Sequence, residues 1–265
     1  MINKNKQVFV VLRFHLIESL RNYQILLTNI ALPILFFITS LLVENNSQMA
    51  PSELSLLIHS QFFSTSLLFG ILNYSFSQPL QNLVEIIEEQ SDLILSQTDL
   101  KYFNFILGKR LGDLLLLNFH VLFVILLFSS LKSVSDVPVL KILLISNLSF
   151  FIINPISDYI ATKIKTVKMA NNIGTLVALL LIFSLTFTNM FSTLSTTDFS
   201  MIEKILVINP MFGFYDSLNM ILQEKEDFYF GSFVNNLTYM ILYAIITFVT
   251  EYIYIYRKAG WSNEK

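Results

Sequence analysis

The chain has 265 residues, of which 54% are hydrophobic and 14% are charged, and its formal net charge is −2. Soluble domains carry about 25% charged residues, so this chain has too few charges to cover a soluble surface of its size, and we expect a membrane protein. The small net charge predicts neither a nucleic-acid partner nor an acidic substrate. The sequence contains no cysteine, which excludes disulfides and thiolate chemistry.

Six apolar runs are long enough to cross a bilayer. A helix needs about 20 residues to span a hydrocarbon core about 30 Å thick. Because lipid offers no partner for open backbone groups, we expect these runs to be helices and not strands. The runs are 24–43, 54–76, 111–131, 140–160, 172–191 and 233–256. The predicted fold is therefore an all-α integral membrane protein, with a single transmembrane domain over residues 1–265.

Lysine and arginine are unevenly distributed among the segments outside these runs. The N-terminal arm carries four, and the second loop, the fourth loop and the C-terminal tail carry three each. The first loop carries none, and the third and fifth loops carry two each. Positive residues are enriched in cytosolic loops. We therefore expect both termini, the second loop and the fourth loop to lie in the cytosol.

Residues 5–23 precede the first span and predict a basic amphipathic helix. Such a helix is typical of the membrane interface, and a plain extension of the first span is the alternative. His15 lies near the edge of the apolar face, and we interpret it as an interfacial histidine and not a ligand. This charged start is unlike a cleaved signal peptide. The apolar face consists of Val8, Phe9, Leu12, Leu16, Leu20 and Tyr23.

The second run is polar for a helix that faces lipid, because it contains Gln61, Thr65 and Asn73. Polar groups inside a membrane usually face other helices or a water-filled path. These residues therefore either pack between helices or line a translocation path.

The longest polar interruption, residues 77–110, separates the second run from the third and holds the densest acidic cluster. From Leu80 onward apolar and acidic residues fall on opposite faces, which predicts an amphipathic helix that begins at Pro79. A solvated face without a partner is one interpretation, and a surface that contacts another protein is the other. The acidic residues are Glu85, Glu88, Glu89, Asp92 and Asp99, of which the first four share the acidic face.

Six spans, an interfacial N-terminal helix and this loop together resemble the membrane subunit of ABC-2 type transporters. In that family the loop typically holds an acidic–basic pair, a glycine turn, a short helix and a Gly-Lys pair before the third span. The chain departs from this pattern because Gln90 replaces the usual arginine and Asp92 replaces the usual glycine. The corresponding positions are Glu88-Glu89, Ser91-Asp92, Ser96-Gln97-Thr98 and Gly108-Lys109.

The resemblance implies that residues 77–110 couple the spans to a separate ATPase subunit. The basic loop 162–172 is a second expected contact, and a positively charged topology anchor is the alternative for it. The residues expected to take part in coupling are Glu85, Glu88, Glu89, Asp92, Lys101, Lys163 and Lys165.

The stretch 192–231 is the longest segment expected outside the cytosol. ABC-2 permeases hold a pair of short re-entrant helices there, joined near an Asn-Pro, and Asn209-Pro210 is the match in this chain. Such segments enter the membrane only where protein or water surrounds them.

No G-x-x-x-x-G-K-[ST] loop occurs in the chain, so we expect no nucleotide binding by that route. The resemblance implies ATP and Mg²⁺ on a partner P-loop ATPase, with no cofactor, metal or catalytic residue on this chain. It also implies a second copy of the chain or a related permease, in a bacterial cell membrane. The expected function is export of an apolar or amphipathic substrate, such as a peptide, bacteriocin, toxin or drug.

An intramembrane enzyme, or a membrane scaffold without an ATPase, is the alternative function. An enzyme would need ionisable groups that meet at one depth in the membrane. The conceivable pairs are His59 with Glu251 and His120 with Asp158.

Overall fold

The computed structural model describes residues 4–89, 100, 102–132, 134, 137–194, 206–223, 229 and 231–253. These residues form helices and contain no strand. Six of the helical segments are long and apolar enough to cross a membrane. The prediction of an all-α, multi-pass membrane protein is therefore confirmed.

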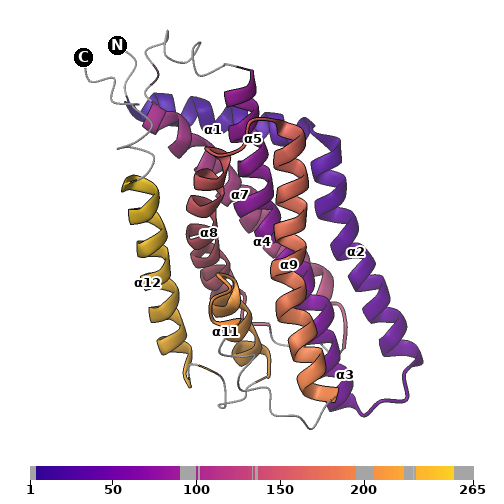
Figure 1. Cartoon of the computed structure of the whole chain (residues 1–265). Helices are drawn as coiled ribbons and strands as arrows, with labels where there is room; N and C mark the ends of the chain where they lie inside the picture. Colours follow the sequence, from indigo (N-terminus) through magenta and orange to yellow (C-terminus); the bar gives the residue numbers. More distant parts are fainter. Residues whose placement is uncertain are drawn as a thin grey trace.

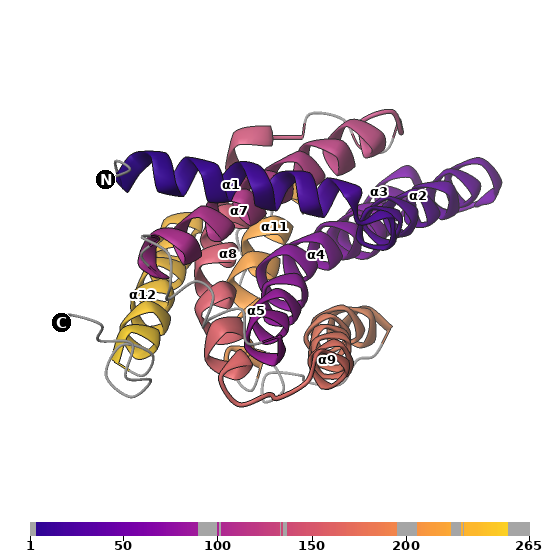
Figure 2. The same ribbon diagram turned by 90° about the horizontal axis from the view of Figure 1, so that it is seen from above.

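The helices stand roughly side by side as a bundle, with α1 lying across one end of it (Figures 1 and 2). We call this end the α1 end. Helix α12 finishes there, whereas α3 and α11 lie toward the opposite end. The bounds are α1 Lys4–Arg21, α2 Tyr23–Asn46, α3 Pro51–Leu57, α4 Ser64–Leu72, α5 Gln78–Glu88, α7 Tyr102–Phe128, α8 Val139–Ala161, α9 Val167–Leu194, α11 Phe212–Gln223 and α12 Phe233–Glu251.

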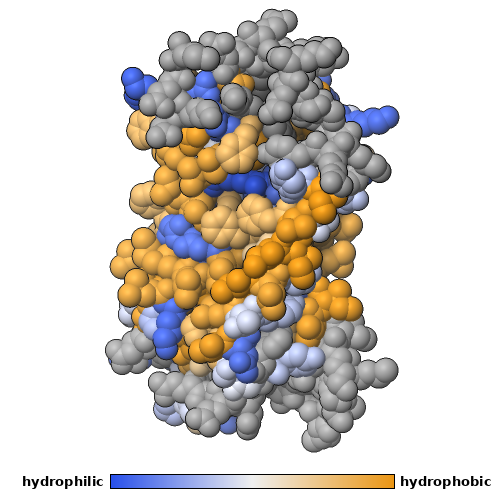
Figure 3. All heavy atoms as spheres, turned by 90° about the vertical axis from the view of Figure 1, so that its left-hand side faces the viewer, coloured by the Kyte–Doolittle hydropathy of each residue, from blue (hydrophilic) through white to orange (hydrophobic). Residues whose placement is uncertain are grey.

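The outer surface of the bundle is apolar along the spans. Only 17% of the span in α2 and 11% of the span in α12 is buried inside the molecule. Figure 3 shows mainly apolar residues over the middle of the side that carries α12. In α12 the exposed side chains include Val234, Ile241, Ile245 and Val249. Surfaces of this kind are stable against lipid or another apolar helix and not against water.

The second span and the acidic helix after it form one continuous helical segment, Pro51–Glu88. Two π-helical segments interrupt its α-helical hydrogen bonding, η1 (Ile58–Phe63) and η2 (Asn73–Ser77). Pro79 lies in the first turn of α5, directly after η2, and does not break the helix. A π-helical turn shifts the hydrogen-bond ladder, and membrane helices tolerate the missing N–H of a proline at such adjustments. The separation expected at Pro79 is therefore absent.

Helix α1 packs on the first half of α7 through small and polar residues. Its buried side chains recur every fourth residue, at Gln7, Val11, His15 and Ser19, which places them on one face. Much of the apolar face expected in the sequence points away from the bundle, with Phe9 65% and Leu20 56% exposed. That exposure suits a helix whose outer face contacts lipid.

Two glycines on α7 allow α1 to approach closely. A Cβ atom at Gly108 would lie 2.7 Å from Val11 Cβ, and one at Gly112 would lie 2.6 Å from His15 Cδ2. These glycines are four residues apart and therefore share one face of α7. Small residues at this spacing let membrane helices meet at short distance.

We predict that Gly108→Leu forces α1 away from α7, because the new side chain overlaps Val11. Overpacking of this kind costs about 1–3 kcal/mol. The measurement is the melting temperature of the purified protein, followed by fluorescence-detected size-exclusion chromatography. Gly174→Ala is the control, because its Cβ would make an ordinary 3.4 Å contact with Ser77 Oγ. Equal melting temperatures for Gly108→Leu and the wild type would show that the close approach is unimportant.

Candidate functional site

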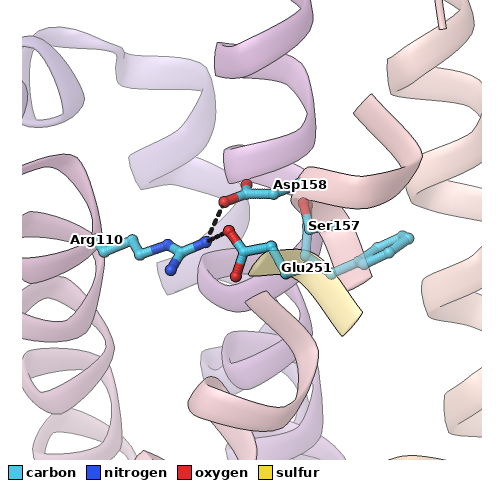
Figure 4. A network of polar contacts seen from close by, with 5 residues as sticks. Arg110, Ser157, Asp158 and Glu251 are labelled. Atoms are coloured by element: carbon cyan, nitrogen blue, oxygen red, sulfur yellow. Dashed lines mark hydrogen bonds and ion pairs between the residues drawn. The ribbon is translucent and has the colours of Figure 1, made fainter. Parts of the chain in front are cut away.

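A buried ion triad joins three spans near the α1 end. Arg110 of α7 lies between Asp158 of α8 and Glu251 of α12 (Figure 4). Arg110 Nη2 donates to Asp158 Oδ2 at 2.5 Å and also donates to Glu251 Oε1. The side chains are 17%, 8% and 9% exposed. The guanidinium also lies 5.5 Å from the centroid of the Phe248 ring.

The triad contains two carboxylates and one guanidinium, so it carries one excess negative charge when all three are ionised. Buried charges are stable only when they are paired and hydrogen-bonded. Lys109 is the neighbouring cation, and it interacts electrostatically with Asp158 and with Asp113. The excess charge of the triad therefore has a counter-charge one residue away on α7.

A second buried pair holds α1 against α7. His15 Nε2 lies 2.6 Å from Asp113 Oδ1, and the two side chains are 2% and 3% exposed. One turn of α7 on the N-terminal side of Gly108, Asn104 Nδ2 donates to Gln7 Oε1 at 2.6 Å. His15 is therefore buried between α1 and α7, where the space left by Gly112 admits its ring, and its position at the membrane interface stays a prediction.

A cavity of about 370 Å³ lies between α1, α5 and α7 at the α1 end. Glu18, Glu85 and Glu89 contribute carboxylates to its walls, and Lys109 contributes one ammonium group. Its remaining walls are largely apolar, formed by Val10, Val11, Phe14, Ile86, Leu100 and Phe105. The described lining therefore carries more negative than positive charge and is otherwise largely apolar. Such a surface suits a segment that presents a cationic side chain among apolar residues.

The expected coupling residues on α5 are divided between two roles. Glu85 and Glu89 are exposed and line the 370 Å³ cavity. Glu88 faces α9 instead, where its Oε2 accepts from Val167 N at 2.6 Å. A carboxylate at a helix N-terminus satisfies an open N–H group and interacts favourably with the helix dipole. Glu88 therefore joins the end of the second span to the beginning of the fifth.

The other expected coupling residues are spread over the α1 end or cannot be located. Lys163 and Lys165 are exposed in the short connection between α8 and α9. The Lys163 ammonium lies 5.9 Å from the centroid of the Tyr159 ring. Asp92 and Lys101 lie outside the described residues.

Asn209 anchors the turn before α11. Its Nδ2 donates to Leu181 O at 3.1 Å and to Ser184 Oγ at 2.9 Å, while its Oδ1 accepts from Met211 N at 2.8 Å. Pro210 follows in the same turn and is half-buried. Helix α11 has 12 residues, which at 1.5 Å per residue is about 18 Å and too short to cross a membrane. It packs on α8, α12 and η1.

The polar residues of the second span do not gather at one place. Asn73 Nδ2 donates to Asn29 Oδ1 of α2 at 2.6 Å, which is interhelical packing. Gln61 and Thr65 are half-buried in η1 and α4. Asn73 therefore makes an interhelical contact. That Gln61 and Thr65 line a translocation path stays a prediction.

Neither histidine–carboxylate pair considered for an enzyme is formed among the described residues. Asp158 and Glu251 both pair with Arg110. His120 Nε2 lies 3.3 Å from Ser66 O, and its ring occupies the space beside Gly70.

The sequence analysis did not identify Arg110 as the partner of Asp158 and Glu251, because it counted Arg110 among the lysines and arginines of the second loop. The available signal was the pair of acids at the ends of two spans, since buried acids need a cation.

A scan against models of protein families found no match, and a search of curated proteins found none either.

We predict that Arg110→Leu lowers the melting temperature more than Asp158→Asn or Glu251→Gln does. Loss of Arg110 leaves two buried carboxylates without their cation, and breaking a buried pair in this way costs about 3–5 kcal/mol. Either single acid substitution leaves Arg110 with its other partner. The triple variant, with Arg110→Leu, Asp158→Asn and Glu251→Gln together, removes all three charges and should recover much of the loss. A triple variant that melts below Arg110→Leu would contradict this account.

We predict that Glu88→Ala increases hydrogen exchange at the start of α9. Charge–dipole interactions at a helix terminus contribute about 0.3–1 kcal/mol, so exchange should rise by no more than about fivefold. The measurement is hydrogen–deuterium exchange of peptides that cover 166–172, in the detergent-purified protein. Glu89→Ala, which removes the carboxylate of the residue directly after α5, should leave these peptides unchanged. An identical response to both substitutions would mean that Glu88 does not cap α9.

Proposed function

We propose that the chain is the membrane permease subunit of an ATP-binding cassette exporter, powered by a separate P-loop ATPase that carries ATP and Mg²⁺. The proposal takes the α1 end as the cytosolic end, in agreement with the distribution of lysine and arginine. The substrate is an apolar or amphipathic molecule, such as a peptide, bacteriocin, toxin or drug. The transmembrane path is completed by a second copy of the chain or by a related permease in a bacterial cell membrane.

The observation that carries the proposal is the acidic cavity at the α1 end, because its walls are attached to several spans at once. Helix α5 continues the second span without a break and is bonded to α9 through Glu88. Helix α1, which forms the opposite wall, is held to α7 through His15 and Asp113. A force applied at the cavity therefore reaches three spans through direct contacts.

The ATPase engages this cavity with a basic, partly apolar segment. The carboxylates of Glu85 and Glu89 complement positive charge on the partner, and the neighbouring apolar walls receive its uncharged surface. Charge complementarity of this kind fixes the orientation of a partner and steers its approach. An acidic surface that contacts only solvent would not require an apolar cavity beside its carboxylates.

Closure of the ATPase subunits on ATP then moves α5 together with the second span. Rigid-body motions of this kind shift a bundle between two packed arrangements. The π-helical segments η1 and η2 are the positions on the second span where hydrogen bonding is already displaced from the α pattern. Such segments often occur at functional sites, and here they let the span adjust while its ends stay attached.

The opposite end of the bundle closes the path. In this proposal α11 is one arm of a re-entrant pair, and the turn at Asn209 and Pro210 holds it against α9. Residues Gln61 and Thr65 lie along the second span between the two ends and contribute to the lining of an otherwise apolar path. Few charges along that path favour a substrate that is itself apolar or amphipathic.

We predict that the double substitution Glu85→Lys and Glu89→Lys abolishes co-purification with any P-loop ATPase encoded beside this chain, and abolishes transport-coupled ATP turnover. Charge reversal replaces attraction by repulsion at the docking surface, and both side chains are exposed, so the fold should persist. Glu53→Lys is the control, because Glu53 is an exposed acid in the first turn of α3, toward the opposite end. The measurement is the amount of ATPase recovered with each tagged variant.

Retention of the ATPase by the Glu85 and Glu89 variant, at wild-type turnover, would exclude docking at this cavity. Absence of any ATPase from the wild-type preparation would exclude the transporter function itself and favour a membrane scaffold.

A further inference from the structure

Asn154 is a buried asparagine on α8. Its side chain is 2% exposed, and neither Nδ2 nor Oδ1 has a partner among the described residues. Buried polar groups almost always have one, and an unpaired buried group costs about 1–3 kcal/mol. Another group must therefore bond to this amide.

Asn154 borders a small cavity of about 20 Å³. Four charged side chains share that cavity with it, Lys109, Arg110, Asp113 and Asp158. Arg110 Nε is also buried and has no partner in the described part of the chain. The cavity therefore borders both the ion triad and the His15–Asp113 pair, and Asp113 and Asp158 interact electrostatically.

The cavity is large enough to hold a water molecule. A cavity needs about 10–15 Å³ to hold a water, and the water needs 2–4 polar partners. Asn154 offers a donor and an acceptor, Arg110 Nε offers a donor, and the two aspartates offer acceptors. The available partners match the hydrogen bonds that a water molecule makes.

The charges of the lining favour water over an ion. Among the described residues, two cations and two carboxylates border the cavity, and their formal charges cancel. A metal ion would sit next to an ammonium and a guanidinium, and an anion would sit next to two carboxylates. A neutral molecule that both donates and accepts avoids either repulsion.

We propose that an ordered water molecule occupies this cavity and bridges Asn154 to the charged side chains around it. The water joins the pair that holds α1 to α7 with the triad that holds α7, α8 and α12. The α1 end then contains one continuous polar layer that extends from α1 to α12. This inference does not depend on the proposed transport function.

Two experiments test the water site. The first is a map of the wild-type protein in nanodiscs at about 2 Å resolution, which should show a peak within about 3.2 Å of the Asn154 amide. The second is hydroxyl-radical labelling by synchrotron X-rays, read by mass spectrometry, because radicals made from a bound water label the side chains beside it. Leu83, which lines the cavity, should be labelled several-fold faster than Leu68, which is fully buried in the apolar core.

Asn154→Leu removes the amide and fills its place, so labelling at Leu83 should fall at least severalfold toward the rate at Leu68. Asn147→Leu is the matched control, because Asn147 lies on the same helix but bonds to Asn118. Its labelling at Leu83 should equal that of the wild type. An absent peak, a peak with the coordination of a metal ion, or unchanged labelling in Asn154→Leu would overturn the proposal. The map keeps the test decisive if Asn154→Leu does not fold.

Discussion

The ion triad of Arg110, Asp158 and Glu251 is the constraint on which the α1 end depends. Helix α12 leaves most of its span exposed outside the bundle, and it packs along one face against α8 and α11. In a membrane the hydrophobic effect does not draw helices together, because lipid is as apolar as leucine. A charge pair in such surroundings must stay closed, since either partner alone is costly to bury. Arg110 therefore fixes the position of α12 relative to α7 and α8.

Polar contacts hold the opposite end of α12 by the same principle. Asn236 Nδ2 donates to Asp216 Oδ2 of α11 at 3.0 Å, and Tyr239 donates to Val207 O at 2.9 Å. The approach of α11 is close, because a Cβ at Gly213 would lie 2.7 Å from Met240 Cγ. Hydrogen bonds therefore hold α12 near both of its ends, while its outer face is available to contact lipid or a second protein.

The sequence predicts the features that depend on local pattern, and it fails where partners are distant. Runs of about 20 apolar residues identify six spans because the bilayer sets their length. The role of Gly108 and Gly112 depends on α1, about a hundred residues earlier in the chain, and no local pattern reveals which helix will face them. Arg110 looks like a loop charge for the same reason, since Asp158 and Glu251 reach it only in the folded bundle. Helical periodicity likewise identified the apolar face of α1 but not that the row of Gln7, Val11, His15 and Ser19 would be the buried one.

The central claim is that the acidic cavity between α1 and α5 receives a P-loop ATPase in the cytosol. The chain has no cysteine, so a single cysteine at position 85 is a unique attachment point for a short photocrosslinker in living cells. The account predicts a covalent adduct with the ATPase from position 85 and none from a cysteine at position 53, toward the opposite end. No adduct from position 85, or equal adducts from both positions, would contradict it.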